Sequence, residues 1–381
     1  ERRGRFLDHL LARFAEDLSE YGRLTATLDE DARTRVIADQ RRLLADYPRV
    51  GSERGQGWDL RRPDEADNLT GYAYRVYRLL GIQDATRRQL AGHRFELEEV
   101  AAGDETFWRF VLRGEGAEVL FASTGCESAA AIEVLLDFVV ELGGDPGRYR
   151  LSADESAWEL IHECPGEEPR VLGATADAGG LDEVVSYFQA HGDGAEGFHV
   201  IEHVLLRKRT GEDPFMPVQL DDPGQCRCVE VRDPYSFRAT VLLPSWPRRF
   251  RDLRFRRLVE DTLRVEAPAH VYLKVCWISH LGMKRFEIAW DEWRRRLAEL
   301  AQAPPGCRGP GLPAAGAPLT GELPLPETGP EHAAYRDALA ALIDELHSQV
   351  TVHPLARLHD CEETTGDAPQ ITLNHTSLGT F

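Results

Sequence analysis

The spacing of apolar residues changes along this chain, and that change limits the possible folds more than any single motif does. Over roughly the first ninety residues, apolar side chains recur at three- and four-residue steps, as they do on one face of an α-helix. From there to about residue 300, short runs typical of β-strands alternate with further helical stripes. The sequence therefore predicts an α+β protein of several domains, and its 381 residues suffice for several small cores.

The first region, residues 1–90, is predicted to be a helical region that serves assembly. Its first stripe is predicted to lie on one face of a single helix and consists of Phe6, Leu7, Leu10, Leu11, Phe14, Leu18 and Tyr21. A second helix is expected to stop at Pro48, and a third to run from about Asn68 to Gly81. Helices of this length are marginal in water by themselves, so these stripes must be buried against one another or against a partner.

From the first stripe we predict a candidate interface with other proteins. Four of its residues come from the helical region, and two aromatic residues come from further along the chain. The full set is Phe6, Leu10, Phe14, Leu18, Trp246 and Phe250. Large apolar side chains in one group favour contact with a partner if the fold leaves them exposed.

The second region, residues 91–197, is predicted to hold two strand–strand–helix modules of about fifty residues each. The first hairpin lies in FWRFVLRGEGAEVLFAS and the second in WELIHECPGEEPRVLGAT, and a helical stripe follows each. The phrases VLFAS and VLGAT begin 52 residues apart, at Val119 and Val171. A duplicated unit explains that spacing, and two unrelated hairpins are the alternative.

The third region, residues 198–301, is predicted to be an α+β module with the element order β-α-β-α. YSFRATVLLP alternates apolar residues on one face, and VYLKVCWIS is a second strand. We expect the sheet to be an open-faced sandwich, covered on one face by the helix between these strands. The face is formed by alternate residues of 237–243 and 271–277, and the stripe that packs on it is Phe255, Leu258, Val259 and Leu263.

The composition of the last eighty or so residues predicts less structure. Residues 302–330 are rich in Pro, Gly and Ala and almost free of charge, which predicts a linker or an extended arm. Residues 331–381 are expected to form one helix, to about residue 347, and a polar C-terminal tail.

Charge and cysteine content exclude several classes of protein. The formal net charge of -19 would repel nucleic acid and anionic membranes, and no run of about 18 apolar residues is present to span a bilayer. A basic run, RRFRDLRFRR at 248–257, is expected to be a solvated helix face or to meet an acidic protein. The seven cysteines are odd in number and scattered, which favours a reducing cytoplasm over a secreted disulfide scaffold.

The best candidate metal site combines His199 and His203 with Cys226 and Cys228, because two histidines and two cysteines satisfy tetrahedral zinc. The histidines also spell His-x-x-Glu-His, an inverted form of a zinc-protease motif. That motif needs a helix, whereas the β-branched residues around it predict a strand, in which the histidines lie about 13 Å apart. We therefore predict no catalytic, cofactor or metal site, with a zinc-dependent hydrolase as the alternative.

Two stretches resemble a known family. FHVIEHVLLRKR with DPYSFRATVLLPSWPRRFRDLRFRRLVEDTLRVEAPAHVYLKVCWIS, and the opening RFLDHLLARFAEDLSEY, are similar to the large baseplate proteins of phage-tail-like extracellular contractile injection systems. The resemblance covers about residues 1–30 and 198–300 and includes no catalytic signature. It implies a structural wedge component that joins baseplate-J-type subunits and other baseplate proteins, in a sixfold assembly around a central spike. It also implies assembly in the cytoplasm and release as part of an extracellular particle.

The sequence thus predicts a structural protein rather than an enzyme, with protein partners and without a cofactor, a small-molecule substrate, nucleic acid or membrane insertion. Amphipathic helices, small α+β modules and a Pro-rich arm are typical of an assembly component, whereas an enzyme should show convergent polar groups. Two other classes stay open. A zinc-dependent hydrolase would contain stoichiometric metal, and a stand-alone binding module would remain monomeric.

Overall fold

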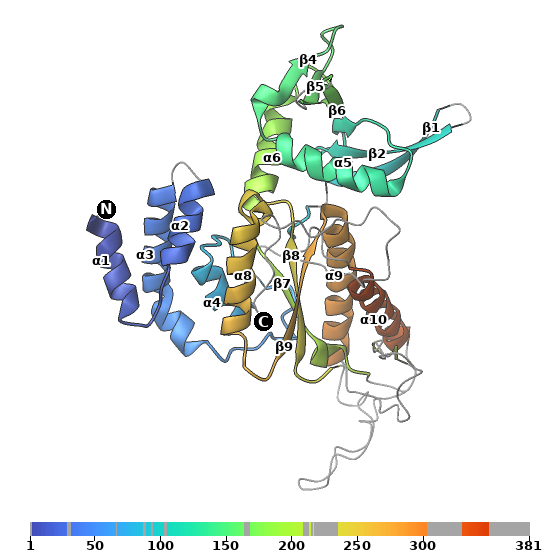
Figure 1. Ribbon diagram of the computed structural model, residues 1–381. Helices are drawn as coiled ribbons and strands as arrows, with labels where there is room; N and C mark the ends of the chain where they lie inside the picture. Colours follow the sequence, from blue (N-terminus) through green and yellow to red (C-terminus); the bar gives the residue numbers. More distant parts are fainter. Residues whose placement is uncertain are drawn as a thin grey trace, which may run out of the picture.

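The computed structural model describes residues 2–28, 32–65, 67–86, 89–92, 94–102, 105–163, 168–208, 213–214, 216, 235–302 and 330–349. Its helices and sheets form a mixed α+β fold with several domains, so the predicted fold class is confirmed. Figure 1 shows a helical group at the left, a six-stranded sheet with two helices at the top, and a three-stranded sheet between helices in the centre. No helix in these ranges is both long and apolar enough to cross a membrane.

The N-terminal region is helical, as predicted, but its first stripe is divided between two helices. The region contains α1 (Arg2–Ala12), α2 (Ser19–Leu28), α3 (Ala32–Ser52) and α4 (Gly71–Leu79). The chain leaves α1 through Ala15, whose φ of 60° is incompatible with a right-handed helix. Helix α2 begins where the Asp17 side chain accepts a hydrogen bond from the Ser19 N–H (2.8 Å). The prediction of a single helix from Phe6 to Tyr21 was therefore wrong.

Helix α3 continues past Pro48, where the sequence predicted its end. A proline removes one hydrogen bond from a helix interior, but side-chain packing can compensate for it. Here Val50 is buried, and the guanidinium of Arg49 lies 4.2 Å from the centroid of the Tyr74 ring on α4. Packing on α4 therefore keeps the last turn helical to Ser52, and the predicted stop was wrong.

The second region forms one six-stranded antiparallel sheet in the order β1-β2-β3-β6-β5-β4. Its first half is β1 (Phe95–Ala102), β2 (Glu105–Arg113), β3 (Val119–Ser123) and α5 (Ala129–Leu142). Its second half is a 3-10 turn, η1 (Pro146–Arg148), then β4 (Tyr149–Leu151), β5 (Trp158–His162), β6 (Arg170–Thr175) and α6 (Leu181–Gly194). Both predicted hairpins are present, and each half has one strand more than the sequence predicted.

The strand order of this sheet is symmetric about its centre, where β3 pairs with β6. Phe121 faces Thr175 and Ser123 faces Gly173, so VLFAS and VLGAT lie side by side in antiparallel register. A side chain at Gly173 would collide with the Phe121 ring, because a Cβ there would lie 2.4 Å from Cζ. Helices α5 and α6 cover this sheet through buried Leu136 and Phe188. The symmetric strand order is the one expected of a duplicated unit. The duplication itself stays a prediction.

The third region has the predicted β-α-β-α order, with additional elements. They are β7 (His199–Glu202), the 3-10 turn η2 (His203–Leu206), β8 (Arg238–Pro244), α7 (Arg248–Arg251), α8 (Leu253–Glu266), β9 (Tyr272–Ile278) and α9 (His280–Gln302). Strand β8 lies between β7, which is antiparallel to it, and β9, which is parallel. The predicted packing of α8 is confirmed for Phe255, Val259 and Leu263, which are fully buried against the sheet, and Leu258 is partly buried there. The predicted sheet face was wrong at Phe237, which is 65% exposed and precedes β8 with a φ of 56°.

The sheet of the third region is covered on both faces, so the prediction of an open-faced sandwich was wrong. The reason is that β8 is apolar on both faces. Val241 and Leu243 belong to the core shared with α8 and the N-terminal helices, whereas Leu242 belongs to the core beneath α9. Helix α10 (Pro330–Ser348) packs on α9, as Figure 1 shows, and matches the helix predicted to end near residue 347. The predicted linker, apart from its first and last residues, and the C-terminal tail lie outside the described residues.

Candidate functional site

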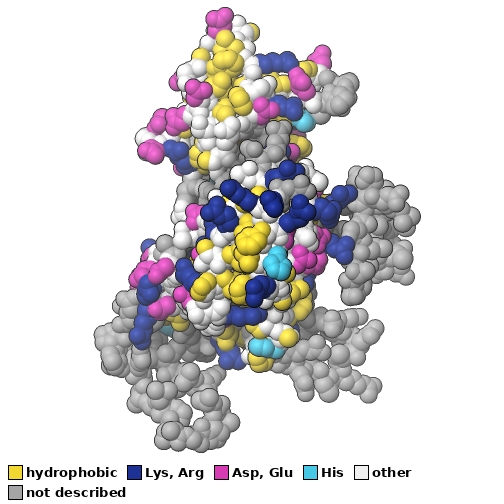
Figure 2. Space-filling model, turned by 90° about the vertical axis from the view of Figure 1, so that its left-hand side faces the viewer, with side chains coloured by type: hydrophobic (Ala, Val, Ile, Leu, Met, Phe, Trp, Pro, Cys, Tyr) yellow, Lys and Arg dark blue, Asp and Glu magenta, His cyan; other side chains and the backbone are white. Residues whose placement is uncertain are grey.

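The outer face of α1 carries exposed apolar side chains. Phe6 is 62% exposed, Phe14 just beyond the helix is 49% exposed, and Leu10 is partly buried. Leu11 points to the other side of α1 and is fully buried in the core of the helical group. Figure 2 views the molecule from the side of α1 and shows hydrophobic side chains in the middle of this face, with Lys and Arg side chains above and below them. We call Phe6, Leu10 and Phe14 the α1 surface.

The position of Phe14 is fixed by contacts that extend to α8. Its ring lies 4.3 Å, centroid to centroid, from the ring of Tyr47 on α3. The Tyr47 hydroxyl lies 3.1 Å from Oε1 of Glu16, whose carboxylate pairs with Arg75 of α4 at 2.9 Å. Arg75 in turn pairs with Glu266 at the end of α8 (2.6 Å). Because these contacts already hold the ring in place, little side-chain entropy is lost when a partner binds it.

Arginines surround the α1 surface in a way that local helix stability does not explain. Arg2, Arg3 and Arg5 stand in the first turns of α1, and Arg13 follows its last turn; all four are exposed. The N-terminus of a helix carries partial positive charge, so acidic residues are favoured there and basic ones are not. Helix α1 has no acidic residue in its first turn. Departures from local preference are expected where a surface serves function.

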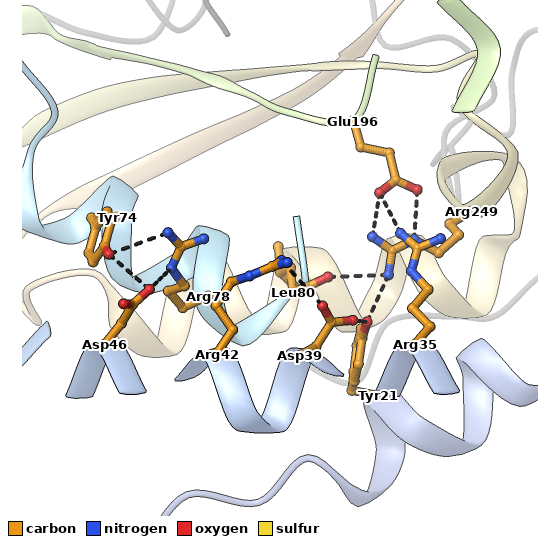
Figure 3. Close-up of polar contacts among 10 residues, drawn as sticks. All are labelled: Tyr21, Arg35, Asp39, Arg42, Asp46, Tyr74, Arg78, Leu80, Glu196 and Arg249. Carbon is orange, nitrogen blue, oxygen red and sulfur yellow. Dashed lines mark hydrogen bonds and ion pairs between the residues drawn. The ribbon is translucent and has the colours of Figure 1, made fainter. Parts of the chain in front are cut away.

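A buried polar network attaches α2 and α3 to the rest of the molecule (Figure 3). Arg249 of α7 donates through Nε to Oε1 of Glu196 (2.6 Å) and through Nη1 to the carbonyl of Leu80 (3.2 Å) and the hydroxyl of Tyr21 (3.3 Å). Arg35 of α3 reaches the same carboxylate at 3.1 Å. The Tyr21 hydroxyl donates to Oδ2 of Asp39 (2.6 Å). Side chains from α2, α3 and α7 thus converge on one point.

The charges of this network are balanced within it. Burial lowers the pKa of Arg249 and its hydrogen bonds to Glu196 raise it, and the net shift is upward, so the guanidinium stays charged. Burial raises the pKa of Tyr21 to about 12, which keeps its hydroxyl a donor. Burial also raises the pKa of Asp39, although the hydrogen bond from Tyr21 opposes this shift. Loss of either Arg249 or Glu196 would leave a buried charge without its main partner.

Three of the six predicted interface residues are core residues, so the prediction was wrong for them. Leu18 is 4% exposed, Trp246 is 3% exposed and Phe250 is fully buried. Leu18 packs inside the helical group, Trp246 lies 4.9 Å from the His280 ring, and Phe250 packs edge-on against Trp277. Apolar spacing cannot distinguish a stripe that faces a partner from one that faces the chain's own core. The candidate interface is reduced to the α1 surface.

The two histidines of the candidate zinc site point to different partners. His199 lies in β7, as its strand-like neighbours predict, and its Nε2 is 2.9 Å from Oε1 of Glu287. His203 lies in the turn that follows, and its Nε2 is 2.8 Å from the hydroxyl of Thr240. Cys226 and Cys228 lie outside the described residues. Within the described part of the chain, no three His, Cys, Asp or Glu side chains are grouped as metal ligands.

The basic run at 248–257 is divided between the fold and the surface. Arg249 belongs to the network of Figure 3, and Arg256 is buried, with its guanidinium bonded to the carbonyls of Phe250 and Ser245. Arg251 pairs with Glu141 of α5 at 2.6 Å. The expectation of a solvated helix face therefore holds for only part of the run.

The sequence analysis missed Glu196 and Glu287, the two acidic residues on which these contacts depend. Glu287 leaves a signal in the sequence, because it stands on the apolar stripe of α9 between Met283 and Trp290. A carboxylate at such a position must find donors inside the protein. Glu196 leaves no such signal, because it lies between α6 and β7.

No family model matches this chain, and no curated protein matches it. The resemblance to baseplate proteins therefore rests on the phrases quoted above and stays a prediction.

Proposed function

We propose that this chain is a structural subunit of a multi-protein assembly and that it joins a partner through the α1 surface. The observation that carries the proposal is the exposure of Phe6 (62%) on α1 and of Phe14 (49%) just beyond it. Exposed apolar groups rimmed by polar residues mark protein interaction sites. The resemblance supplies the particular assembly: a baseplate wedge of a phage-tail-like contractile injection system, with baseplate-J-type partners.

The α1 surface contains enough apolar area to matter for binding. Full burial of a phenylalanine side chain is worth about 1.5–3 kcal/mol, and Phe6 and Phe14 have 62% and 49% of their surface left to bury, so together they supply on the order of 2–3 kcal/mol before association costs. The surrounding arginines add contacts to acidic groups of a partner, which act mainly on association rate and specificity. Such a surface is dispensable for the fold of the free chain, because neither phenylalanine is part of its core.

The test is the double variant Phe6→Asp/Phe14→Asp, produced together with the neighbouring gene products. Loss of co-purifying partners and of assembled particles is expected, with an unchanged melting temperature of the isolated chain. The matched control is Val134→Asp, since Val134 is 57% exposed on α5, which covers the sheet of the second region (Figure 1). Assembly of the double variant at the yield of the control would refute the proposal.

A further inference from the structure

A cavity of about 90 Å³ lies among α4, β7 and α9. Its apolar wall comes from Trp58, Tyr77, Phe198 and Trp290. The rings of Trp58 and Trp290 stand 6.2 Å apart, centroid to centroid, and those of Tyr77 and Phe198 are stacked at 4.5 Å. Aromatic walls with a few polar groups are typical of small-molecule sites.

His199 lines this cavity, and its orientation is set by Glu287 behind it. Glu287 is 1% exposed and accepts hydrogen bonds from the backbone N–H groups of Leu90 (2.6 Å) and Ala91 (3.2 Å). Both oxygens of Glu287 thus accept hydrogen bonds, so Nε2 of His199, which faces Oε1, is the donor of their contact. An imidazole with its hydrogen on Nε2 keeps Nδ1 as an acceptor.

Asn68 and Thr70, two other polar groups of the cavity wall, are already engaged. Asn68 donates to the carbonyls of Asp59 and Arg62 and accepts from the Asp59 N–H. Thr70 caps α4 by accepting from the N–H of Ala73. Arg294, also on the wall, is held by its own contacts: it donates to the Pro63 carbonyl and pairs with Asp291.

Nδ1 of His199 is different from these groups, because the described residues provide it with no hydrogen bond. The ring itself is held in place by Glu287 and by packing at 5.4 Å from the Phe286 ring. Glu202 places a second acceptor at the cavity. Two acceptors and an aromatic wall suit a molecule that donates a hydrogen bond. The charge of Arg294 is already paired with Asp291, so the carboxylate of Glu202 disfavours an anion.

We propose that this cavity binds a small organic molecule, neutral or cationic, whose O–H or N–H group donates a hydrogen bond to Nδ1 of His199. A ring of such a molecule packs against Trp58 and Trp290, and its outer edge stays at the mouth of the cavity. The site is independent of the α1 surface and of the proposed assembly.

The first test uses phenol and anisole, which share a ring but differ in the O–H donor, with benzoate as an anionic probe. Binding to the full chain is followed by the NMR shift of the Trp58 indole N–H, identified by its absence in Trp58→Phe. Phenol should bind at least tenfold more tightly than anisole, and benzoate should not bind. Equal affinity for phenol and anisole, preference for benzoate, or no binding of phenol at 20 mM would overturn the proposal.

A second test addresses the acceptor itself. His199→Gln keeps a donor to Glu287 and removes the ring acceptor, so phenol affinity should fall at least tenfold. His203→Gln, four residues away and outside the cavity, should leave it unchanged. If His199→Gln does not fold, the ¹⁵N spectrum of the wild-type ring decides: the Nε2–H tautomer, with an Nδ1 resonance that shifts on phenol addition, supports the site. The Nδ1–H tautomer, or an Nδ1 resonance that phenol leaves unmoved, contradicts it.

Discussion

Replacing Asp137 by asparagine should stabilise the protein at neutral pH and leave its stability in acid nearly unchanged. Asp137 lies on α5 where this helix meets the start of α9, and its Oδ1 is buried without a hydrogen-bond partner among the described residues. Its pKa is raised from 3.8 to about 7, mainly by burial and also by the nearby carboxylates of Glu133 and Glu141, although a hydrogen bond from the backbone of His280 opposes this shift. The native state therefore disfavours the charged form.

The magnitude follows from the difference between the folded and unfolded pKa values. A group whose pKa is raised on folding contributes stability that is fully present below its unfolded pKa of 3.8 and is lost as the pH rises through about 7. At about 1.4 kcal/mol per pKa unit, ionised Asp137 lowers the free energy of unfolding by about 4 kcal/mol at pH 8. Asparagine stays neutral and can still accept from the His280 N–H, so it avoids this loss.

The assay is urea unfolding of both proteins from pH 4 to pH 8. The Asp137→Asn variant should be more stable by about 4 kcal/mol at pH 8, by roughly half as much near pH 5.5, and by only about 0.5 kcal/mol at pH 4. Asp337→Asn, at an exposed position on α10, is the control and should change stability by less than about 0.5 kcal/mol at every pH. A difference between Asp137→Asn and wild type that does not vary with pH would refute this reasoning.

Three further predictions concern packing and the buried network, and each is measured by denaturant unfolding at pH 7. Arg249→Met should lower the free energy of unfolding by about 3–5 kcal/mol, because it leaves the buried carboxylate of Glu196 with Arg35 as its remaining ionic partner. Phe255→Ala should lower it by about 3–5 kcal/mol through the cavity left between α8 and its sheet. Phe6→Ser should change it by less than about 0.5 kcal/mol, since the ring is mostly exposed; a large loss would mean that Phe6 belongs to the core.

Much of the fold was predictable because local spacing and long-range packing agree. The Phe255, Val259 and Leu263 stripe has helical spacing and is buried on one side of α8, so the sequence alone identifies both the helix and its inner face. The same holds for the hairpins of the second region, whose strands are separated in the sequence by short segments that contain Gly or Pro.

The errors arise where tertiary contacts override a local signal. Pro48 is a stop signal, yet α3 continues because Val50 is buried against neighbouring helices. The spacing from Phe6 to Leu18 suggests one helix, yet the chain turns at Ala15 and buries Leu18 from the next segment. Apolar pattern alone also assigned Trp246 to an interface. Its burial depends on α6 and α9, which are distant in the sequence.

The cavity next to His199 could not be predicted from the sequence for a related reason. The spacing of His199 from His203 suggested a metal ligand, but the orientation of the His199 ring is set by its hydrogen bond to Glu287, 88 residues away. Glu287 in turn is fixed by the backbone of Leu90 and Ala91, nearly two hundred residues before it. Backbone donors leave no trace in a residue pattern, so neither the hydrogen bonds of Glu287 nor the orientation of His199 follows from the sequence.

Buried polar contacts join the three regions and fix how they are oriented. Arg249 and Glu196 attach the helical group, and His280 of α9 meets His191 of α6 with their Nε2 atoms 2.8 Å apart. Burial holds the pKa of His280 well below its usual range, so one ring donates and the other accepts. Apolar cores tolerate repacking, whereas such contacts fix donor and acceptor positions. The orientation of the regions, and with it the position of the α1 surface, therefore depends on a small set of polar side chains.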